Sequence, residues 1–121
     1  MLAIFTRKNS MQIIETIEQF EHLKQQEDAL LVLFGGQNCN ICHVIRPKVE
    51  AMVAEVYPKV VMVYVDCHLH PELGAQESIF SLPVLRVYFG GQKFIEEVRS
   101  FSVQKVVNDM ERPYKMMFAE A

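Results

Sequence analysis

Two continuous apolar runs, "ALLVLF" at residues 29–34 and "VVMVYV" at residues 60–65, stand out in the hydrophobic pattern of the chain. Neither run alternates with polar residues, which is typical of strands covered on both faces of a parallel or mixed sheet. Between them, apolar residues recur at helical spacing and predict one helix, with Pro47 inside it as a kink and Pro58 just after its end. The apolar face of this helix comprises Ile45, Val49, Met52, Val53 and Val56. A strand, a helix and a strand over this distance form a βαβ unit, so we expect the two strands to be parallel neighbours.

Shorter patterns flank this unit on both sides. "MQII" at residues 11–14 predicts a short strand, and the helical spacing of Ile13, Ile17 and Phe20 predicts a helix after it. A loop with a short helix around residues 71–79 follows the second apolar run. The domain is therefore expected to open with a strand and a helix before the βαβ unit begins.

The last third of the chain predicts a hairpin and a final helix. The strand-like segments "VLRVYF" at residues 84–89 and "QKFIEEV" at residues 92–98 are joined by a Gly-Gly pair. Ser102 is placed to cap a helix that ends or bends at Pro113. The apolar stripe of that helix is Val103, Val106, Val107 and Met110. Together the elements predict an α/β domain with a central mixed β-sheet flanked by helices.

Length and composition fit one folded domain. The chain has 121 residues, of which half are hydrophobic and about a fifth are charged, and a domain of this size buries enough surface to fold without disulfide staples. Patterned sequence begins at Met11. We therefore expect an N-terminal extension at residues 1–10, which we leave unassigned, and a domain at residues 11–121.

Charge and hydrophobicity argue against two classes of partner. Twelve basic and fifteen acidic residues give a net charge of -3, whereas nucleic-acid-binding domains usually carry a basic patch. The longest apolar runs have six residues, far fewer than the ~20 that span a bilayer. The first ten residues place apolar side chains before basic ones, which is the reverse of a secretory signal. We therefore expect a cytoplasmic protein that binds neither nucleic acid nor membrane.

The candidate chemistry lies in "GGQNCNICH", residues 35–43. Cys39, Cys42 and His43 form a C-x-x-C-H spacing that is compatible with a redox dithiol, half of a zinc site or the attachment of c-type haem. Haem attachment needs an export signal and a haem-sized pocket. The N-terminal sequence does not predict the signal, and the strand-helix frame fills the interior with core, so haem is the weakest of the three interpretations.

Zinc stays open on the residues alone. Cys67 and His70 would add a third thiolate and an imidazole to Cys39 and Cys42, a ligand set that zinc accepts. The two pairs are separated by twenty-four residues, which exceeds the usual ~15 to 20. However, both pairs follow neighbouring parallel strands and could meet at one edge of the sheet. Without zinc, Cys67 is either a structural, inert thiol or a regulatory one.

The position between a strand and a helix favours the redox interpretation. Cys39 falls at the first turn of the predicted helix, where unpaired N–H groups and the helix dipole stabilise a thiolate. Cys42 lies about one turn further along and is expected to be covered by the chain. This asymmetry predicts an exposed nucleophile and a recessed resolving thiol, which are the two roles that disulfide exchange requires.

In these features the sequence resembles the thioredoxin family from about Met11 to Met110. "LLVLFGGQNCNICHVIRP" resembles the strand, C-x-x-C and helix of the family, including Pro47 five residues after the second cysteine. "VVMVYVD" resembles the following strand, and "SLPVLRVYFGGQ" resembles the segment that holds the family's cis-proline. The resemblance implies a thioredoxin fold and a protein-disulfide oxidoreductase that needs no cofactor.

The same resemblance implies roles for individual residues. Cys39 would attack the substrate disulfide and Cys42 would resolve the mixed disulfide. A cis peptide bond would precede Pro83, and the backbone of Leu82 would pair with an extended substrate segment. The implied partners are protein disulfides and a thiol electron donor such as a reductase.

The sequence departs from the family pattern around the cysteines. Asn38 stands where most members have tryptophan, and Asn40-Ile41 stands where they have Gly-Pro. Leu33 and Met62 replace an aspartate and a lysine that help to deprotonate the resolving cysteine. We therefore expect slower activation of that thiol, or a role as base for the histidine that follows it. The departures also leave open a non-catalytic binding or adaptor module that acts through the surface around the cis-proline.

Overall fold

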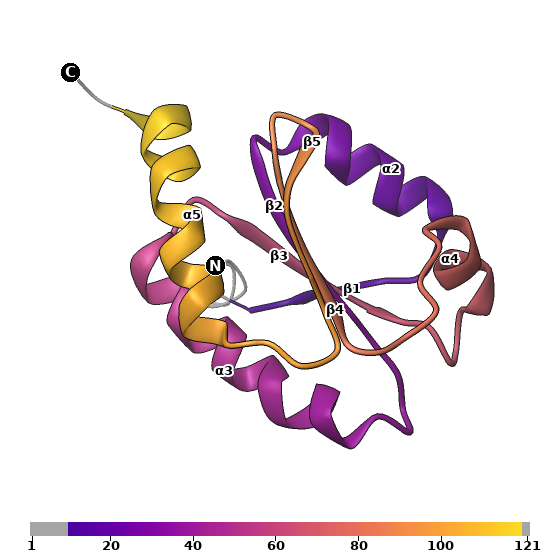
Figure 1. Cartoon of the computed structure of the whole chain (residues 1–121). Coiled ribbons are helices and arrows are strands. Elements are labelled where there is room, and N and C mark those ends of the chain that lie inside the picture. The colour runs from indigo at the N-terminus through magenta and orange to yellow at the C-terminus, as the bar shows by residue number, and fades with distance from the viewer. Residues whose placement is uncertain (1–9, 120–121) are drawn as a thin grey trace, which may run out of the picture.

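The computed structural model describes residues 10–119, in which a five-stranded sheet lies between two layers of helices (Figure 1). The elements in chain order are β1 (Gln12–Ile14), α2 (Ile17–Gln26), β2 (Ala29–Gly35), α3 (Asn40–Val56), β3 (Val61–Asp66), α4 (Pro71–Gln76), β4 (Val84–Phe89), β5 (Gln92–Val98) and α5 (Val103–Phe118). The predicted extension at residues 1–10 lies, apart from Ser10, outside the described residues.

The sheet has the strand order β1-β3-β2-β4-β5. β3 pairs in parallel with both β1 and β2, whereas β4 pairs antiparallel with both β2 and β5. This mixed sheet confirms the predicted fold class. It also confirms that the two continuous apolar runs are parallel neighbours, joined by the crossover through α3.

β2 occupies the centre of the sheet, and every residue in it is buried. Leu31 and Leu33 belong to the core that faces α3 and α5, while Leu30, Val32 and Phe34 belong to the core that faces α2 and α4. Figure 1 shows these two pairs of helices on opposite faces of the sheet. The strand therefore has no solvent face, which explains why its sequence shows no polar alternation.

The helix termini follow the predicted signals, with one exception at each of two helices. Thr16 and Gln19 form a reciprocal capping box at the start of α2. α3 continues through Pro47, and the kink that the sequence predicts there stays a prediction. α4 ends at Gln76, three residues earlier than predicted, and is followed by a left-handed residue at Ser78.

α5 does not end at Pro113, which was one of the two outcomes that the sequence predicted there. The helix begins after the cap at Ser102 and continues to Phe118. Proline removes one backbone hydrogen bond, but aromatic packing holds the turns beyond it. The ring of Tyr114 lies 4.7 Å from that of Tyr57 and 4.8 Å from that of Phe118. Among residues 10–119, no helix combines the length and apolar character that a membrane span requires.

Arg86 is a buried charge in the middle of β4, and several partners compensate for its burial. Its Nε and Nη1 donate to the carboxylates of Glu96 and Glu77, each at 2.8 Å, and its Nη2 donates to the Glu77 carbonyl at 2.8 Å. Its guanidinium carbon also lies 5.2 Å from the centroid of the Phe34 ring. Arg86 thus ties the end of α4 to β4 and β5.

Replacing Arg86 with Met tests the contribution of this network to stability. The change leaves the largely buried carboxylate of Glu77 without its cation, so we expect the free energy of unfolding in urea to fall by about 3 kcal/mol. The matched control is Lys115→Met, which breaks an exposed ion pair with Glu111 and should cost less than about 0.5 kcal/mol. Equal effects of the two changes would contradict this interpretation of Arg86.

Candidate active site

The two cysteines of the C-x-x-C sequence lie between the end of β2 and the first turn of α3. Cys39 is the N-cap of α3, and its Sγ accepts a hydrogen bond from the Cys42 N–H at 3.3 Å. The two residues form a disulfide across Cα atoms 5.3 Å apart. Cys39 is half-buried, whereas Cys42 is 0% exposed. The two residues therefore differ in burial in the predicted direction, with Cys42 the more buried.

Two glycines, Gly35 at the end of β2 and Gly36 after it, precede the turn that leads to the cysteines, and neighbouring side chains fill the space beside them. A Cβ atom on Gly35 would overlap the hydroxyl group of Tyr64, and a Cβ atom on Gly36 would overlap the imidazole ring of His68. Of the two contacting residues, Tyr64 lies within β3 and His68 lies just after its end. The absence of side chains at Gly35 and Gly36 therefore lets this segment pack closely on β3 and on the loop that follows β3.

The ends of β2 and β3 lie side by side. Gly35 is in register with Asp66, the last residue of β3, and the Cys67 N–H donates to the Gly35 carbonyl at 2.8 Å. The loops that follow the two strands therefore start from the same edge of the sheet. This is where parallel neighbouring strands bring together residues that are far apart in sequence.

His68 connects these two loops, a contact that sequence reasoning missed. Asp66 Oδ1 accepts the backbone N–H groups of His68 and Leu69 at 2.9 and 3.0 Å, which fixes the turn after β3. The Asn38 N–H then donates to His68 Nδ1 at 3.2 Å. His68 is exposed, as an ordinary loop histidine would be. The only signal in the sequence was its place at the end of a strand predicted to neighbour β2.

His43 makes a second contact with the same loop. Its Nε2 lies 3.0 Å from the carbonyl oxygen of Gln37, and since a carbonyl only accepts, this nitrogen carries the proton. The arrangement leaves Nδ1 of the neutral ring without its proton. His43 is exposed on α3. Its suggested role as a base for Cys42 stays a prediction.

The segment before β4 contains the expected cis peptide bond, between Leu82 and Pro83. Pro83 is buried and Leu82 is half-buried. Leu82 also lines a hollow of about 310 Å³ together with His68 and the 86% exposed Phe80. Because His68 contacts Asn38, this hollow lies beside the C-x-x-C loop. The structure thus brings Leu82 into the neighbourhood of the cysteines.

Buried apolar side chains occupy the two positions at which the family pattern has an aspartate and a lysine. Leu33 is 0% exposed and Met62 is 1% exposed, and both belong to the core that faces α3. Cys42 therefore has neither of those two ionisable groups behind it. Any proton acceptor for its thiol has to come from another part of the site.

The third thiol, Cys67, is held in its neutral form. Burial of its side chain, with a further contribution from the charge of Asp66, raises the pKa of Cys67 to about 11. A thiol with such a pKa has almost no thiolate near neutral pH and is a poor nucleophile. This agrees with the interpretation of Cys67 as an inert thiol and disfavours a regulatory role.

The structure does not assemble the four side chains considered for zinc. Nowhere between residues 10 and 119 do three or more His, Cys, Asp or Glu side chains lie together in a way that could hold a metal ion. Cys39 and Cys42 are joined to each other, and His70 Nδ1 lies 3.7 Å from the carboxylate of Glu72. The zinc interpretation therefore lacks its ligand set.

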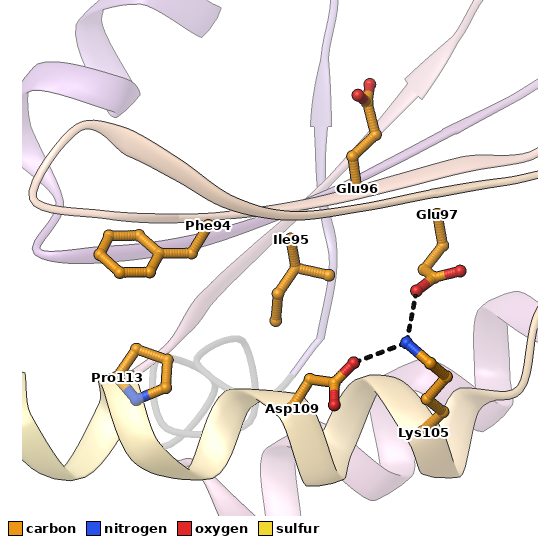
Figure 2. A pocket seen from close by; sticks show the side chains of 7 residues that line it. All are labelled: Phe94, Ile95, Glu96, Glu97, Lys105, Asp109 and Pro113. Atoms are coloured by element: carbon orange, nitrogen blue, oxygen red, sulfur yellow. Dashed lines mark hydrogen bonds and ion pairs between the residues drawn. The ribbon is translucent and has the colours of Figure 1, made fainter.

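A larger hollow, of about 420 Å³, lies between β5 and α5 and contains none of the predicted site residues. Figure 2 shows Lys105 of α5 between Glu97 of β5 and Asp109 of its own helix, at 3.0 and 2.8 Å. Lys105 thus bridges two carboxylates, and the lining also contains the apolar groups Phe94, Ile95 and Pro113. The hollow brings together no candidate nucleophile, so the cysteines remain the candidate active site.

Besides the sheet order, the cysteine pair at the start of α3 and the cis-proline, the chain matches a family model over most of its length. The model described as Thioredoxin matches residues 11–112. The chain belongs to the thioredoxin family. Membership and the Cys39–Cys42 pair support thiol–disulfide oxidoreductase chemistry in general.

Two thioredoxin-like relatives share low sequence identity with this chain. The chain is 20% identical over 107 residues to "Thioredoxin-like protein YdfQ" of Bacillus subtilis, which covers 88% of this chain and 95% of that protein. It is 24% identical over 91 residues to "Thioredoxin-like 3-2, chloroplastic" of Arabidopsis thaliana, covering 74% of this chain but 47% of the plant protein.

Solved thioredoxin structures share the fold. A thioredoxin from Trypanosoma brucei brucei superimposes with a TM-score of 0.77 at 19% identity, covering 87% of this chain and 91% of that one. A mutant thioredoxin from Halobacterium salinarum gives a TM-score of 0.76 at 15% identity, covering 86% and 90% of the two chains. At this level of identity, the likeness establishes the arrangement of helices and strands and leaves the chemistry to the residues of this chain.

The pKa of Cys67 predicts the labelling behaviour of the reduced protein. With a pKa of about 11, Cys67 should carry roughly a few hundred times less thiolate at pH 7.5 than an unperturbed cysteine with a pKa of ~8.5. Brief treatment with iodoacetamide followed by peptide mass mapping should therefore modify Cys39 and leave Cys67 unmodified in the folded protein. In urea, where the burial is removed, Cys67 should react like the other cysteines. Rapid modification of Cys67 in the folded state would show that its thiol is not suppressed.

Proposed function

We propose that this thioredoxin-family protein is a protein-disulfide oxidoreductase that uses Cys39 as the nucleophile and Cys42 as the resolving thiol. The observation that carries the proposal is the unequal burial of the two sulfurs at the start of α3. Cys39 is half-buried at the helix N-cap, while Cys42 has no exposed surface. An external disulfide can therefore approach one sulfur and not the other.

The position of Cys39 supports its role as the attacking thiolate. The Cys42 N–H, in the first turn of α3, donates to Cys39 Sγ at 3.3 Å in the disulfide form, and the start of a helix favours an anion. After reduction, the same donor stabilises the Cys39 thiolate over the thiol. Each pKa unit of such stabilisation corresponds to ~1.4 kcal/mol.

The proposed reaction has two exchange steps. The Cys39 thiolate attacks one sulfur of a protein disulfide, a mixed disulfide forms, and the other substrate sulfur leaves as a thiolate that takes up a proton. Cys42 then loses its proton and attacks the Cys39 sulfur, which forms the Cys39–Cys42 disulfide and releases the second substrate thiol. The substrate gains two electrons and the protein loses two. A thiol electron donor such as a reductase would restore the dithiol.

The surface beside the cysteines supports a protein substrate. We propose that the backbone of Leu82, before the cis bond to Pro83, pairs with an extended segment of the substrate. The hollow of about 310 Å³ that Leu82 and Phe80 line would accept a neighbouring apolar side chain. We assign this function to the domain at residues 11–121, of which the family model covers residues 11–112.

A non-catalytic adaptor is the alternative, and two observations favour it. The positions of the aspartate and lysine in the family pattern hold the buried Leu33 and Met62, so the resolving step lacks its usual assistance. Phe80, at 86% exposure, also offers an apolar contact that could hold a partner without any exchange of disulfides. The two functions differ in whether the cysteines are repeatedly oxidised and reduced.

Insulin reduction driven by dithiothreitol separates the two functions. The wild-type protein should accelerate the reduction, and Cys39→Ser should fall to the uncatalysed rate because the attacking sulfur is gone. Cys67→Ser is the matched control and should keep the wild-type rate, since its thiol is neutral and outside the C-x-x-C sequence. Equal rates for the wild type and Cys39→Ser would end the enzymatic proposal and leave the adaptor.

A further inference from the structure

His43 and His68 each form a hydrogen bond with the loop that leads into Cys39, one at Gln37 and the other at Asn38. His43 donates from Nε2 to the carbonyl of Gln37 at 3.0 Å, and His68 accepts the N–H of Asn38 at Nδ1 at 3.2 Å. Gln37 and Asn38 are the two residues directly before Cys39. The backbone that positions the attacking sulfur is therefore fixed by one histidine donor and one histidine acceptor.

The imidazole of His68 is itself well positioned. Asp66 Oδ1 accepts the backbone N–H groups of His68 and its neighbour Leu69 at 2.9 and 3.0 Å. The His68 ring lies over Gly36, where any Cβ atom would overlap it. Two independent observations, a hydrogen bond and a close packing contact, thus place this side chain against the loop of the cysteines. Asp66, which fixes the turn that carries His68, is the last residue of β3.

The two histidines respond differently to protonation. Imidazoles gain their second proton between about pH 5 and 8. A protonated imidazole has two donors and no acceptor. His43 is already a donor and keeps its bond to Gln37 when it is protonated. His68 loses its acceptor, and its new Nδ1–H group faces the Asn38 N–H.

We propose that neutral His68 is a positioning residue for Cys39, and that protonation of His68 releases the Gln37–Asn38 loop and lowers the reactivity of the Cys39 thiolate. The proposal rests on the proposed function for the importance of Cys39. It goes beyond that function by adding a residue from the loop after β3 and a dependence on pH. His68 acts through Asn38 and does not itself contact the substrate disulfide in this scheme.

The other ionisable groups near the loop come from β3, the loop after it, α3 and α4. Asp66 is the anion next to this loop, and its Oδ1 accepts the backbone N–H of His68. Burial raises the pKa of Cys67 to about 11, so that thiol stays neutral while a histidine titrates. On β3 and α3, Arg46 lies over the ring of Tyr64, and His43 contacts Gln37. α3 also carries Lys48, Glu50 and Glu55. At α4, His70 lies beside Glu72.

Two substitutions, with side chains of similar shape, separate the effect of the hydrogen-bond acceptor from the effect of filling the space. His68→Asn keeps an oxygen near the position of Nδ1 and does not titrate, whereas His68→Leu fills the space without an acceptor. In the reduced protein at pH 8, we expect iodoacetamide to modify Cys39 about threefold more slowly in His68→Leu, as suits the loss of one exposed hydrogen bond. His68→Asn should restore a rate within about a factor of 1.5 of the wild type. His22→Leu, an exposed change on α2, is the control and should have no effect.

Nuclear magnetic resonance of the oxidised protein tests the contact itself and needs no activity. Between pH 5 and 8, the Asn38 amide signal should move with the same midpoint as the ring signals of His68, and His68→Asn should abolish that movement. A wild-type alkylation rate in His68→Leu, or an Asn38 amide that does not follow His68, would overturn the proposal. Failure of the insulin assay would instead count against the oxidoreductase function, because the amide titration is independent of it.

Discussion

The site depends on the parallel pairing of β2 with β3. Their register aligns Gly35 with Asp66, so both strands deliver their following loops to one edge of the sheet. β2 is buried along its whole length between two cores, and a strand in that environment cannot slip by one residue without exchanging its two buried faces. The place at which the cysteines emerge is therefore fixed by the core. The loop after β3 is fixed beside them for the same reason.

The start of α3 then divides the two sulfurs between different environments. The N-cap position leaves Cys39 accessible and close to backbone donors, while the helix carries Cys42 into the interior. With Leu33 and Met62 behind it, the interior side of the site is apolar. The ionisable side chains that contact this site come instead from its loops and from the exposed surface of α3: His43 and His68 contact the backbone before Cys39. These histidine contacts therefore lie at the surface of the site, whereas the two core positions that depart from the family pattern are apolar.

Much of this could be predicted from the sequence because the relevant signals are local. Continuous apolar runs located β2 and β3, and the difference in exposure between Cys39 and Cys42 followed from their places in one helical turn. The end of α5 could not be read in the same way. Pro113 is a local stop signal, but the packing of Tyr114 on Tyr57 joins residues far apart in the chain and outweighs it.

The contacts of single polar side chains were also beyond the sequence. His68 looked like any solvated loop residue, and its bond to Asn38 depends on the turn that Asp66 fixes and on the absence of a side chain at Gly36. The ion pairs of Arg86 likewise depend on Glu77 and Glu96, which lie outside β4. Such contacts require three segments to be in place at once, and no pattern along one segment records them.

The different roles of the two sulfurs can be tested most directly by trapping the mixed disulfide. Reduced Cys42→Ser and reduced Cys39→Ser are each mixed with a peptide disulfide at pH 7.5, and the adducts are located by peptide mass mapping. The structure predicts that Cys42→Ser accumulates one peptide on Cys39, because no second thiol can release it, and that Cys39→Ser stays unmodified on the same time scale. An adduct that forms equally fast on Cys42 in the Cys39→Ser protein would contradict the proposed mechanism.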